Sequence, residues 1–459
     1  MSEPRVKFFA LFLFLFLAVG SSFAQTTAPA TPIPTGKNPI IIIPGLTGSD
    51  LVNRKTGEAV WFNNHRAKDD DLRLPMSPNI STNHDNLVAK DIIRAVKFLK
   101  FLPETEIYER LIDALQTRGG YREASWSTSA RKDAEDTFYV FPYDWRQDNV
   151  ESARLLIRRI ETLKRRLGKP DLKFNIIAHS MGGLVARYAA MYGNAELSAT
   201  PKPTWAGGRH FSKIFLLGTP NEGSIESLSS LLHGFSYVGG ALNLPFIQDI
   251  TRFDVFTVPS AYQLLPPPGA FVAYDESFNR IEIDIFDPAN WEKYDWAIWK
   301  DPDFTKKFDA TEQKNSPAFL TAALNRAKLF HAALAASGVA KPPVSFYLVG
   351  ADCKETPAAV LLLRDEKKGR WETRFKADGF TRSNGEKVKG EDVKNLLFSV
   401  GDSVVTKRSL TAESQRAALP ITEELYQCVG HNKLVTSTEV QDKLFAFLSA
   451  AAAAPVASH

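Results

Sequence analysis

Short apolar segments that alternate with amphipathic stretches dominate the hydrophobic pattern of the chain. The first segment, residues 40–43, consists of four isoleucines between Pro39 and Pro44. A continuous β-branched run of this length is typical of a strand that is buried on both faces, as in a parallel sheet. Runs of the same kind predict four further strands, at residues 137–141, 174–178, 213–218 and 344–350.

An amphipathic helix is predicted between the second and third of these strands. Its apolar side chains recur at intervals of three or four residues between residues 150 and 167, namely Leu156, Ile160, Leu163 and Leu167. Strands that alternate with helices in this way predict an α/β fold with a mostly parallel, doubly wound sheet. Functional side chains of such folds gather beyond the carboxyl ends of the strands.

Two stretches interrupt the alternation. Residues 49–90 are polar, show little periodicity and contain three consecutive aspartates at residues 69–71. Residues 224–340 form a long insertion that is rich in Phe, Trp, Tyr and Pro. Structureless connections of such length are uncommon in compact domains, so this insertion is expected to fold as a cap or lid.

The N-terminus has the composition of a cleaved export signal. Arg5 and Lys7 precede an apolar segment, residues 8–20, and Ser22-Phe23-Ala24 places small residues at both cleavage positions. A membrane-spanning helix needs about 20 apolar residues, so this segment is too short for an anchor. We therefore expect a signal peptide at residues 1–24, a flexible linker at residues 25–38, and a secreted or periplasmic mature protein without a stable transmembrane anchor.

The overall composition is that of an ordinary globular protein. Of the 459 residues, 44% are hydrophobic, which excludes a disordered or low-complexity chain. The 56 Lys and Arg residues nearly balance the 52 Asp and Glu residues and leave a net charge of +4. A nucleic-acid-binding protein would carry a concentrated basic stripe, so no nucleic-acid partner is expected.

The two cysteines, Cys353 and Cys428, are the candidates for one disulfide. An even number of cysteines in an exported chain favours pairing, with two separate buried thiols as the alternative. The sequence contains no Cys/His cluster with the spacing of metal ligands, so no metal or cofactor is expected.

The most informative motif is Ala-His-Ser-Met-Gly-Gly at residues 178–183, which joins the third predicted strand to a helix that ends before Gly193. A serine at the apex of a sharp turn between a strand and a helix is the arrangement of a nucleophile elbow. The strained turn needs small residues two positions before and after the serine, here Ala178 and Gly182. The helix N-terminus also brings backbone N–H groups to the reacting carbonyl. The position of Ser180 between a strand and a helix therefore makes it the predicted nucleophile.

A serine nucleophile needs a histidine base and a carboxylate that orients it. In folds with this elbow the chain order is serine, acid, histidine, so the base comes late in the sequence. Three histidines are late enough: His331, His431 and His459. His331 falls in a helical pattern and His459 ends an Ala-rich tail, whereas His431 lies in a loop just before a final amphipathic helix. His431 is therefore the predicted base.

Two aspartates compete for the position of the acid. Asp352 directly follows the predicted strand at residues 344–350, where many such enzymes carry their acid. Asp402 stands in Gly-Asp-Ser-Val-Val, a turn directly before an apolar pair. The turn favours Asp402, and Asp352 is the alternative.

An oxyanion hole is expected next to the elbow. One donor should be the backbone N–H of the residue after the nucleophile, Met181, and the other should come from the loop after the first strand. That loop is Pro-Gly-Leu-Thr-Gly at residues 44–48, in which Leu46 is the expected donor and Gly45 permits close approach of the backbone. An ordinary turn is the alternative for this segment.

Six segments, in this order, resemble the lecithin:cholesterol acyltransferase family of α/β-hydrolases, which includes lysosomal phospholipase and phospholipid:diacylglycerol acyltransferases. They are Ile-Pro-Gly-Leu-Thr-Gly-Ser at 43–49, Pro-Tyr-Asp-Trp-Arg at 142–146, the elbow at 178–183, Leu-Gly-Thr-Pro-Asn-Glu-Gly-Ser at 217–224, Gly-Asp-Ser-Val-Val at 401–405 and Gly-His at 430–431. The Pro-Tyr-Asp-Trp-Arg segment is the most specific, because generic lipases lack it.

The resemblance runs from about residue 39 to 448. It implies an α/β-hydrolase catalytic domain over these residues, with a cap or lid insertion at about 224–340. The Ala-rich residues 449–459 that follow are expected to form a disordered tail. It also assigns the acid to Asp402, since the family's acid stands in a Gly-Asp-Gly-Thr-Val segment. Two features depart from the family: Ser403-Val404 replaces Gly-Thr, and residues 49–90 contain no Cys where animal members carry a disulfide.

Together with the expected export signal, the resemblance implies an exported serine lipid acyl hydrolase or acyltransferase that acts on fatty acyl esters of the phospholipid type. Ser180, Asp402 and His431 would form its triad, and its partner would be lipid ester substrate at a membrane or micelle surface. Two alternatives stay open: a carboxyl-ester hydrolase for small esters or polyesters, and a non-catalytic binding protein on a hydrolase scaffold. The sequence does not distinguish water from an alcohol as the acyl acceptor.

Overall fold

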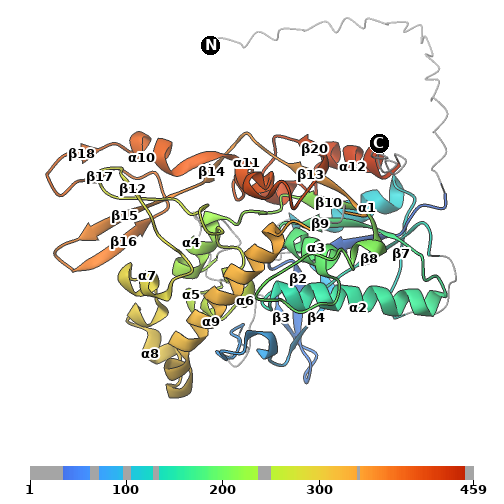
Figure 1. Ribbon diagram of the computed structural model, residues 1–459, viewed down its shortest axis with the longest axis horizontal. Coiled ribbons are helices and arrows are strands. Elements are labelled where there is room, and N and C mark those ends of the chain that lie inside the picture. Colours follow the sequence, from blue (N-terminus) through green and yellow to red (C-terminus); the bar gives the residue numbers. More distant parts are fainter. Residues whose placement is uncertain are drawn as a thin grey trace, which may run out of the picture. The chain divides into compact units, whose positions relative to one another are not determined.

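The computed structural model describes residues 35–62, 72–96, 105–127, 134–235, 250–338 and 342–449 (Figure 1). All of them belong to one compact unit. The expected signal peptide, most of the linker, the aspartates at 69–71 and nearly all of the expected tail, with His459, lie outside the described residues. Within the described ranges, no helix combines the length and the apolar character that crossing a membrane requires.

A seven-stranded sheet with the order β20-β13-β10-β9-β1-β8-β7 forms the centre of the fold. All six pairs of neighbouring strands are parallel, as the continuous apolar runs predict. The five predicted strands are present, and two edge strands, the two-residue β7 and the six-residue β20, complete the sheet. Their bounds are β1 Ile40–Ile43, β7 Arg122–Glu123, β8 Thr137–Val140, β9 Phe174–His179, β10 Phe211–Leu217, β13 Ser345–Gly350 and β20 Ile421–Tyr426.

Helices cover both faces of this sheet (Figure 1). Ile41 and Ile43 of β1 belong to the core that contains the apolar faces of α2 and α3, whereas Ile40 and Ile42 belong to the core under α1 and α12. The strand is thus buried on both sides, which confirms the predicted α/β-hydrolase fold. The helices of these two layers are α1 Glu109–Thr117, α2 Asn149–Leu167, α3 Met181–Tyr192 and α12 Thr438–Ser449.

The polar stretch after β1 contains more regular structure than its pattern predicts. It forms a three-stranded antiparallel sheet with the order β3-β2-β4. Register shifts interrupt both ladders of this sheet, and such bulges break the two-residue alternation by which a sequence reveals a strand. The elements here are β2 Ser49–Asn53, β3 Ala59–Trp61, the 3₁₀ turn Ile80–Thr82 and β4 Leu87–Ile92, and the antiparallel pair β5 Ala95–Val96 and β6 Thr105–Glu106 follows.

The aromatic-rich insertion is mostly helical. Trp291 and Trp296 are buried in the same core as β1, so the insertion packs as part of the domain. Its elements are α4 Ile225–His233, α5 Arg252–Phe256, α6 Pro259–Tyr262, β11 Ala273–Tyr274, β12 Arg280–Ile281, α7 Pro288–Lys293, the 3₁₀ turn Ile298–Lys300, α8 Phe304–Lys307 and α9 Ala310–Ala335.

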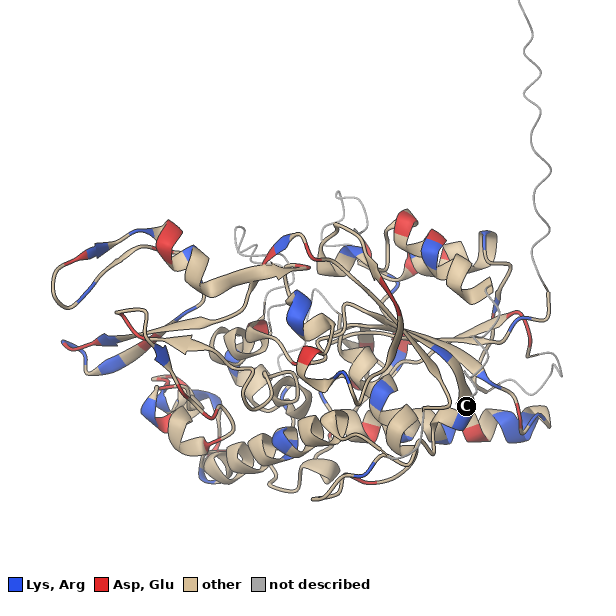
Figure 2. Cartoon of the chain, turned by 45° about the horizontal axis from the view of Figure 1, so that its top comes forward, with Lys and Arg blue, Asp and Glu red and all other residues tan. Residues whose placement is uncertain are grey.

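A second excursion, between β13 and Asp402, has no counterpart in the sequence-based prediction. One of its strands, β15, pairs with β11, so both excursions share the four-stranded sheet β12-β11-β15-β16. Charged residues of both signs are interspersed over its hairpins (Figure 2). The elements are β14 Lys354–Pro357, β15 Val360–Asp365, β16 Arg370–Arg374, β17 Phe380–Thr381, β18 Lys387–Val388, α10 Gly390–Leu397 and β19 Phe398–Gly401.

Short elements complete the chain. They are α11 Lys407–Leu410 and three 3₁₀ turns, Gly208–His210, Glu413–Gln415 and His431–Lys433.

Candidate active site

The predicted elbow is present between β9 and α3. Ser180 lies between His179, which ends the strand, and Met181, which begins the helix, and it has a φ of 53°. A positive φ is strained for a residue with a side chain and persists only where the surroundings enforce it. Gly182 allows the start of α3 to pack closely against the loop after β1, because a Cβ atom there would lie 2.5 Å from the carbonyl oxygen of Pro44. The small residue predicted on this side of the serine is therefore required by close backbone packing.

Ser180, His431 and Asp402 form one hydrogen-bonded chain. The Ser180 hydroxyl donates to Nε2 of His431 at 2.9 Å. Nδ1–H of His431 donates to Oδ2 of Asp402 at 2.7 Å. The three side chains come from the β9–α3 turn, the turn after β19 and the 3₁₀ turn that begins at His431. The structure therefore brings together all three residues that the sequence predicts for a triad.

The environment of Asp402 keeps its carboxyl ionised. Burial by itself would raise the pKa, but the interaction with His431 and two backbone hydrogen bonds outweigh it, so the pKa is lowered from its ordinary value. The backbone donors are the N–H groups of Val404 at 3.0 Å and Val405 at 2.7 Å, both to Oδ1. The Gly-Asp-Ser-Val-Val turn thus holds one carboxylate oxygen and leaves the other for the histidine.

The competition between Asp352 and Asp402 has a structural explanation. The chain leaves β13 near Asp352, makes the second excursion and returns on β19, where Gly401 pairs with Lys354 in an antiparallel ladder. This pairing brings Asp402 close to the carboxyl end of β13, although 50 residues separate it from Asp352 along the chain. Asp352 itself forms an ion pair with Lys407 at 2.9 Å.

The two other late histidines lie elsewhere. His331 lies on α9 and is buried in the main core, the larger core that also contains Ile41 and Ile43 of β1. Its ring packs against Phe286 and Phe330. His459 lies outside the described residues.

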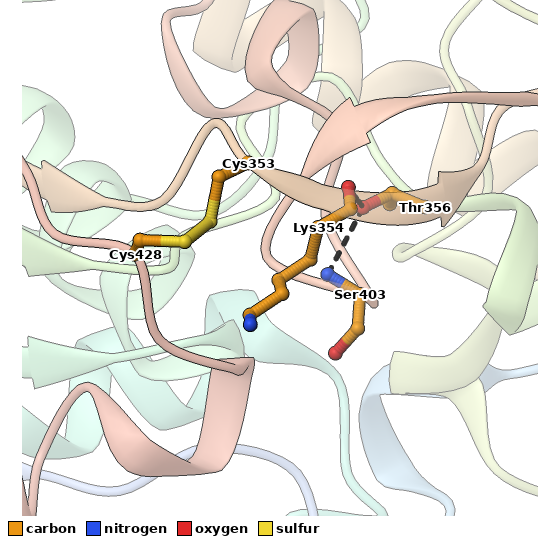
Figure 3. The surroundings of a disulfide bond; sticks show 5 residues. All are labelled: Cys353, Lys354, Thr356, Ser403 and Cys428. Atoms are coloured by element: carbon orange, nitrogen blue, oxygen red, sulfur yellow. Dashed lines mark hydrogen bonds between the residues drawn. A yellow bond between two sulfur atoms is a disulfide. The ribbon is translucent and has the colours of Figure 1, made fainter.

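The two cysteines form a disulfide, with Cα atoms 5.7 Å apart (Figure 3). Cys353 leads into β14, and Cys428 is three residues before His431. The bond therefore connects the strand that supports the acid turn to the loop that carries the histidine.

A hydrogen bond extends this connection to the acid turn. Ser403, which follows Asp402, donates its backbone N–H to Oγ1 of Thr356 on β14 at 2.9 Å (Figure 3). The acid turn and the histidine loop are thus both attached to the segment that begins at Cys353.

The loop after β1 lies against the nucleophile, where the oxyanion hole is expected. A Cβ atom at Gly45 would lie 2.9 Å from Cβ of Ser180, so only glycine permits this approach. Met181 is the first residue of α3, and its N–H has no carbonyl partner within the helix. The N–H of Leu46 donates no hydrogen bond to any residue that the structure describes. Neither expected donor thus has a hydrogen-bond partner among the residues that the structure describes.

A hydrogen-bonded chain behind the elbow connects this loop to the histidine. The N–H of Gly45 donates to the Tyr108 hydroxyl oxygen at 2.9 Å, and that oxygen lies 2.9 Å from Nδ1 of His179. Nε2 of His179 lies 3.4 Å from the carbonyl oxygen of His431. A carbonyl only accepts, so Nε2 carries the proton of a neutral His179 and the Tyr108 hydroxyl donates to Nδ1.

The neutral state of His179 follows from its surroundings. Burial, with the neighbouring His431 as a smaller cause, lowers the pKa of His179 to about 3. A neutral ring beside His431, with 5.0 Å between the ring centroids, does not oppose a positive charge there. Sequence reasoning missed both Tyr108 and His179, because neither contact is local along the chain.

The family model described as lecithin:cholesterol acyltransferase matches residues 57–313, more than half of the chain. The chain belongs to the lecithin:cholesterol acyltransferase family. This confirms the resemblance that the sequence motifs indicate.

Two curated proteins of Arabidopsis thaliana are similar to part of the chain. Phospholipase A(1) LCAT3 is 26% identical over 259 residues, which cover 50% of this chain and 53% of that protein. Phospholipid–sterol O-acyltransferase is 29% identical over 131 residues, which cover 27% of this chain and 19% of that protein. The chain thus spans about half of the first relative and less of the second.

Among solved structures, the Tle4–Tli4 complex contains a chain with a similar fold. The TM-score is 0.54 at 13% sequence identity, and the match covers 90% of this chain and 98% of that chain. This likeness supports the fold and extends it over nearly the whole chain.

The family-specific Pro-Tyr-Asp-Trp-Arg segment holds the loop after β1 and the polar stretch that follows it. The Tyr143 hydroxyl donates to the carbonyl oxygen of Pro44 at 2.9 Å and so holds the loop after β1. Arg146 is fully buried and pairs with Asp144 at 2.8 Å and with Asp85 at 2.6 Å. Asp85 lies in the polar stretch, so this ion-pair cluster attaches that stretch to the catalytic core.

A cavity of about 330 Å³ opens beside Ser180 and His431. The wall formed by α5 and α6 and by the residues that flank them is apolar, whereas the wall formed by α4 carries serines and one carboxyl group, Glu226. The apolar lining residues include Ile250, Val255, Val258, Ala261 and Leu264. The sequence singled out none of the α4 residues, because an acidic residue in the first turn of a helix is ordinary.

The described residues contain no cluster of His, Cys, Asp and Glu that could hold a metal ion.

Proposed function

We propose that the chain is a serine lipid acyl hydrolase or acyltransferase in which Ser180 and His431 act directly on the ester and Asp402 orients the histidine. The observation that carries this proposal is the hydrogen-bonded chain Ser180–His431–Asp402 at the edge of a cavity with one apolar wall. Chains of this kind activate a hydroxyl that is a weak nucleophile at its ordinary pKa.

The first half of the reaction acylates Ser180. His431 Nε2 takes the hydroxyl proton as Ser180 Oγ attacks the ester carbonyl, and Asp402 stabilises the imidazolium that forms. The N–H groups of Leu46 and Met181 would bind the oxyanion of the tetrahedral intermediate. When the intermediate collapses, the bond to the leaving alcohol breaks, His431 returns the proton to that alcohol, and the acyl group remains on Ser180.

The second half releases the acyl group. His431 takes a proton from water or from an acceptor alcohol, whose oxygen attacks the acyl carbonyl. The tetrahedral intermediate then expels Ser180 Oγ, which recovers its proton from His431. Water yields a free fatty acid, and an alcohol yields a new ester.

The proposed substrates are fatty acyl esters of the phospholipid type. An apolar wall beside the nucleophile suits an acyl chain, and the family's matched relatives are called a phospholipase A(1) and a phospholipid–sterol O-acyltransferase. We propose further that the α4–α9 insertion is the cap of this site, because α4 to α6 supply much of its wall. Residues 1–24 are proposed as an export signal, and a disulfide suits the oxidising compartment beyond it.

A labelled fluorophosphonate tests the proposal, because it reacts only with an activated serine. The expected result is one adduct that peptide mapping locates on Ser180, absent from Ser180→Ala protein. Product analysis with phospholipid, with and without a lipid alcohol, then distinguishes hydrolysis from transfer. Absence of labelling would favour the non-catalytic binding protein. Labelling with turnover of short esters but not of phospholipid would favour the small-ester hydrolase.

A further inference from the structure

The α4 wall of the cavity is polar, which is unusual beside a pocket for acyl chains. Side chains three and four positions apart share one face of a helix. On α4 and its N-cap the cavity face consists of Ser224, Glu226, Ser227 and Ser230. The opposite face is buried in the main core and consists of Ile225, Leu228, Leu231 and Leu232.

The serines of this wall have no proton left for a ligand. Ser224 donates its hydroxyl to the carbonyl oxygen of Val404 at 2.6 Å, and Ser227 donates to that of Ala261 at 2.6 Å. Ser230 donates to the backbone carbonyl oxygen of Glu226 at 2.9 Å. Because a hydroxyl has one proton, these serines offer a ligand only lone pairs. The wall therefore accepts hydrogen bonds and donates none through its side chains.

Glu226 adds a carboxyl group without a partner. Its backbone is fixed, with the N–H donating to Ser224 Oγ at 3.2 Å, but its carboxyl forms no hydrogen bond or ion pair with any residue that the structure describes. The side chain is partly buried, and burial raises the pKa of the carboxyl. The partial positive charge of the helix N-terminus favours the ionised carboxylate, and no charged side chain among the described residues pairs with it. A carboxylate held this way at a cavity wall gains from a ligand that brings a positive charge.

We propose that Glu226 binds the primary ammonium of an aminophospholipid head group and thereby selects ethanolamine-type lipids as substrates. Such an ammonium supplies the charge that the carboxylate lacks and three N–H donors for a wall of acceptors. A quaternary ammonium brings the charge without a donor, and a glycerol head group brings donors without a positive charge. An anionic head group would be repelled. The inference rests on the proposed function, since it assigns specificity to the same cavity.

Head-group competition tests the inference. Hydrolysis of phosphatidylethanolamine, phosphatidylcholine and phosphatidylglycerol with identical acyl chains is measured in mixed micelles with the wild type, Glu226→Gln and Glu226→Lys. The control is Glu439→Gln, which removes an exposed first-turn glutamate from α12. The readout is the ratio of kcat/KM values between head groups, which a general loss of folding or activity does not change.

Glu226→Gln should lower the ratio of phosphatidylethanolamine to phosphatidylcholine by about tenfold or more, since hydrogen bonds to charged groups are among the stronger ones. Glu226→Lys should shift preference toward phosphatidylglycerol, and Glu439→Gln should leave every ratio unchanged. Equal loss for all three lipids in Glu226→Gln would assign the carboxyl a structural role and overturn the inference. Loss confined to phosphatidylglycerol would also overturn it, because the recognised group would then be a hydroxyl.

Binding separates this inference from the proposed function. Calorimetric titration of Ser180→Ala protein with glycerophosphoethanolamine should show binding that weakens by about tenfold when Glu226→Gln is added. If this binding is found while phospholipid turnover is absent, the proposed function fails alone. If turnover is found while head-group ratios and binding ignore Glu226, the inference fails alone.

Discussion

The Tyr108 hydroxyl lies 2.9 Å from Nδ1 of His179, the residue before Ser180. The same hydroxyl accepts the N–H of Gly45, so one oxygen ties the loop of the proposed oxyanion hole to the nucleophile elbow. Through the carbonyl of His431 the chain continues to the proposed base. We propose that Tyr108 and His179 are positioning residues, which set the distances between the groups proposed to act on the ester.

Tyr108→Phe should lower kcat by about tenfold to a hundredfold, less than the loss of an oxyanion-hole donor itself, with little change in KM. It should also lower the free energy of unfolding by about 1–3 kcal/mol, because Gly45 N–H and His179 Nδ1 lose their partner. Steady-state kinetics and denaturant unfolding measure the two effects. Tyr121→Phe is the matched control, since the buried Tyr121 hydroxyl forms no hydrogen bond with the residues described. Equal changes in both variants would contradict the positioning role.

Disruption of the disulfide should loosen the acid turn and the histidine loop together. Cys353 and Cys428 are separated by 75 residues, and closure of a loop of that size stabilises a fold by roughly 4 kcal/mol in the chain-entropy account. The double variant Cys353→Ser/Cys428→Ser should therefore unfold at lower denaturant concentration and show a lower kcat in folded protein. A variant with unchanged stability and unchanged kcat would show that the bond supports neither loop.

Buried histidines should make the fold sensitive to acid. Burial lowers the pKa of His331 to about 4 from an ordinary value of 6.5. Because the unfolded chain binds the proton more readily, stability is fully present above about pH 6.5 and is lost as the pH falls toward 4. His331→Leu should reduce this loss by about 2–3 kcal/mol between pH 7.5 and 4, as urea unfolding can measure. The exposed His84, replaced by Gln, is the control, and an equal pH dependence in all three proteins would contradict the assignment.

The acid can be tested against its rival. Asp402→Asn should lower kcat by about 10⁴-fold, because an amide favours the wrong tautomer of His431. Asp352→Asn removes only the ion pair with Lys407, which is partly exposed, and should change kcat by less than about tenfold. The reverse ranking would move the acid to Asp352.

The local parts of the site could be predicted from the sequence. The elbow depends on one strand, one turn and one helix that are contiguous in the chain, and chain order then selects His431. The acid was harder, because Asp402 reaches the sheet edge only through the pairing of β14 with β19. The excursion between these two strands was not predicted, because its strands are short and carry many charged residues and so give little periodic signal.

Tyr108 and Glu226 lay beyond sequence reasoning for a different reason. Tyr108 is 71 residues from His179, and its role is a tertiary contact with no local pattern. In the sequence, Glu226 resembles an ordinary acidic residue in the first turn of a helix. Only the structure shows that it faces a cavity beside serines whose hydroxyls already donate to backbone carbonyls. The proposed role of each side chain depends on tertiary contacts that leave no pattern in the sequence.

The most direct test of the account is the rate of phospholipid hydrolysis by Ser180→Ala protein. The variant should unfold at the same denaturant concentration as the wild type and lose activity by about 10⁶-fold, as expected for a triad nucleophile. Residual activity above about one per cent of the wild-type rate in a correctly folded variant would contradict the assignment of Ser180 as the nucleophile.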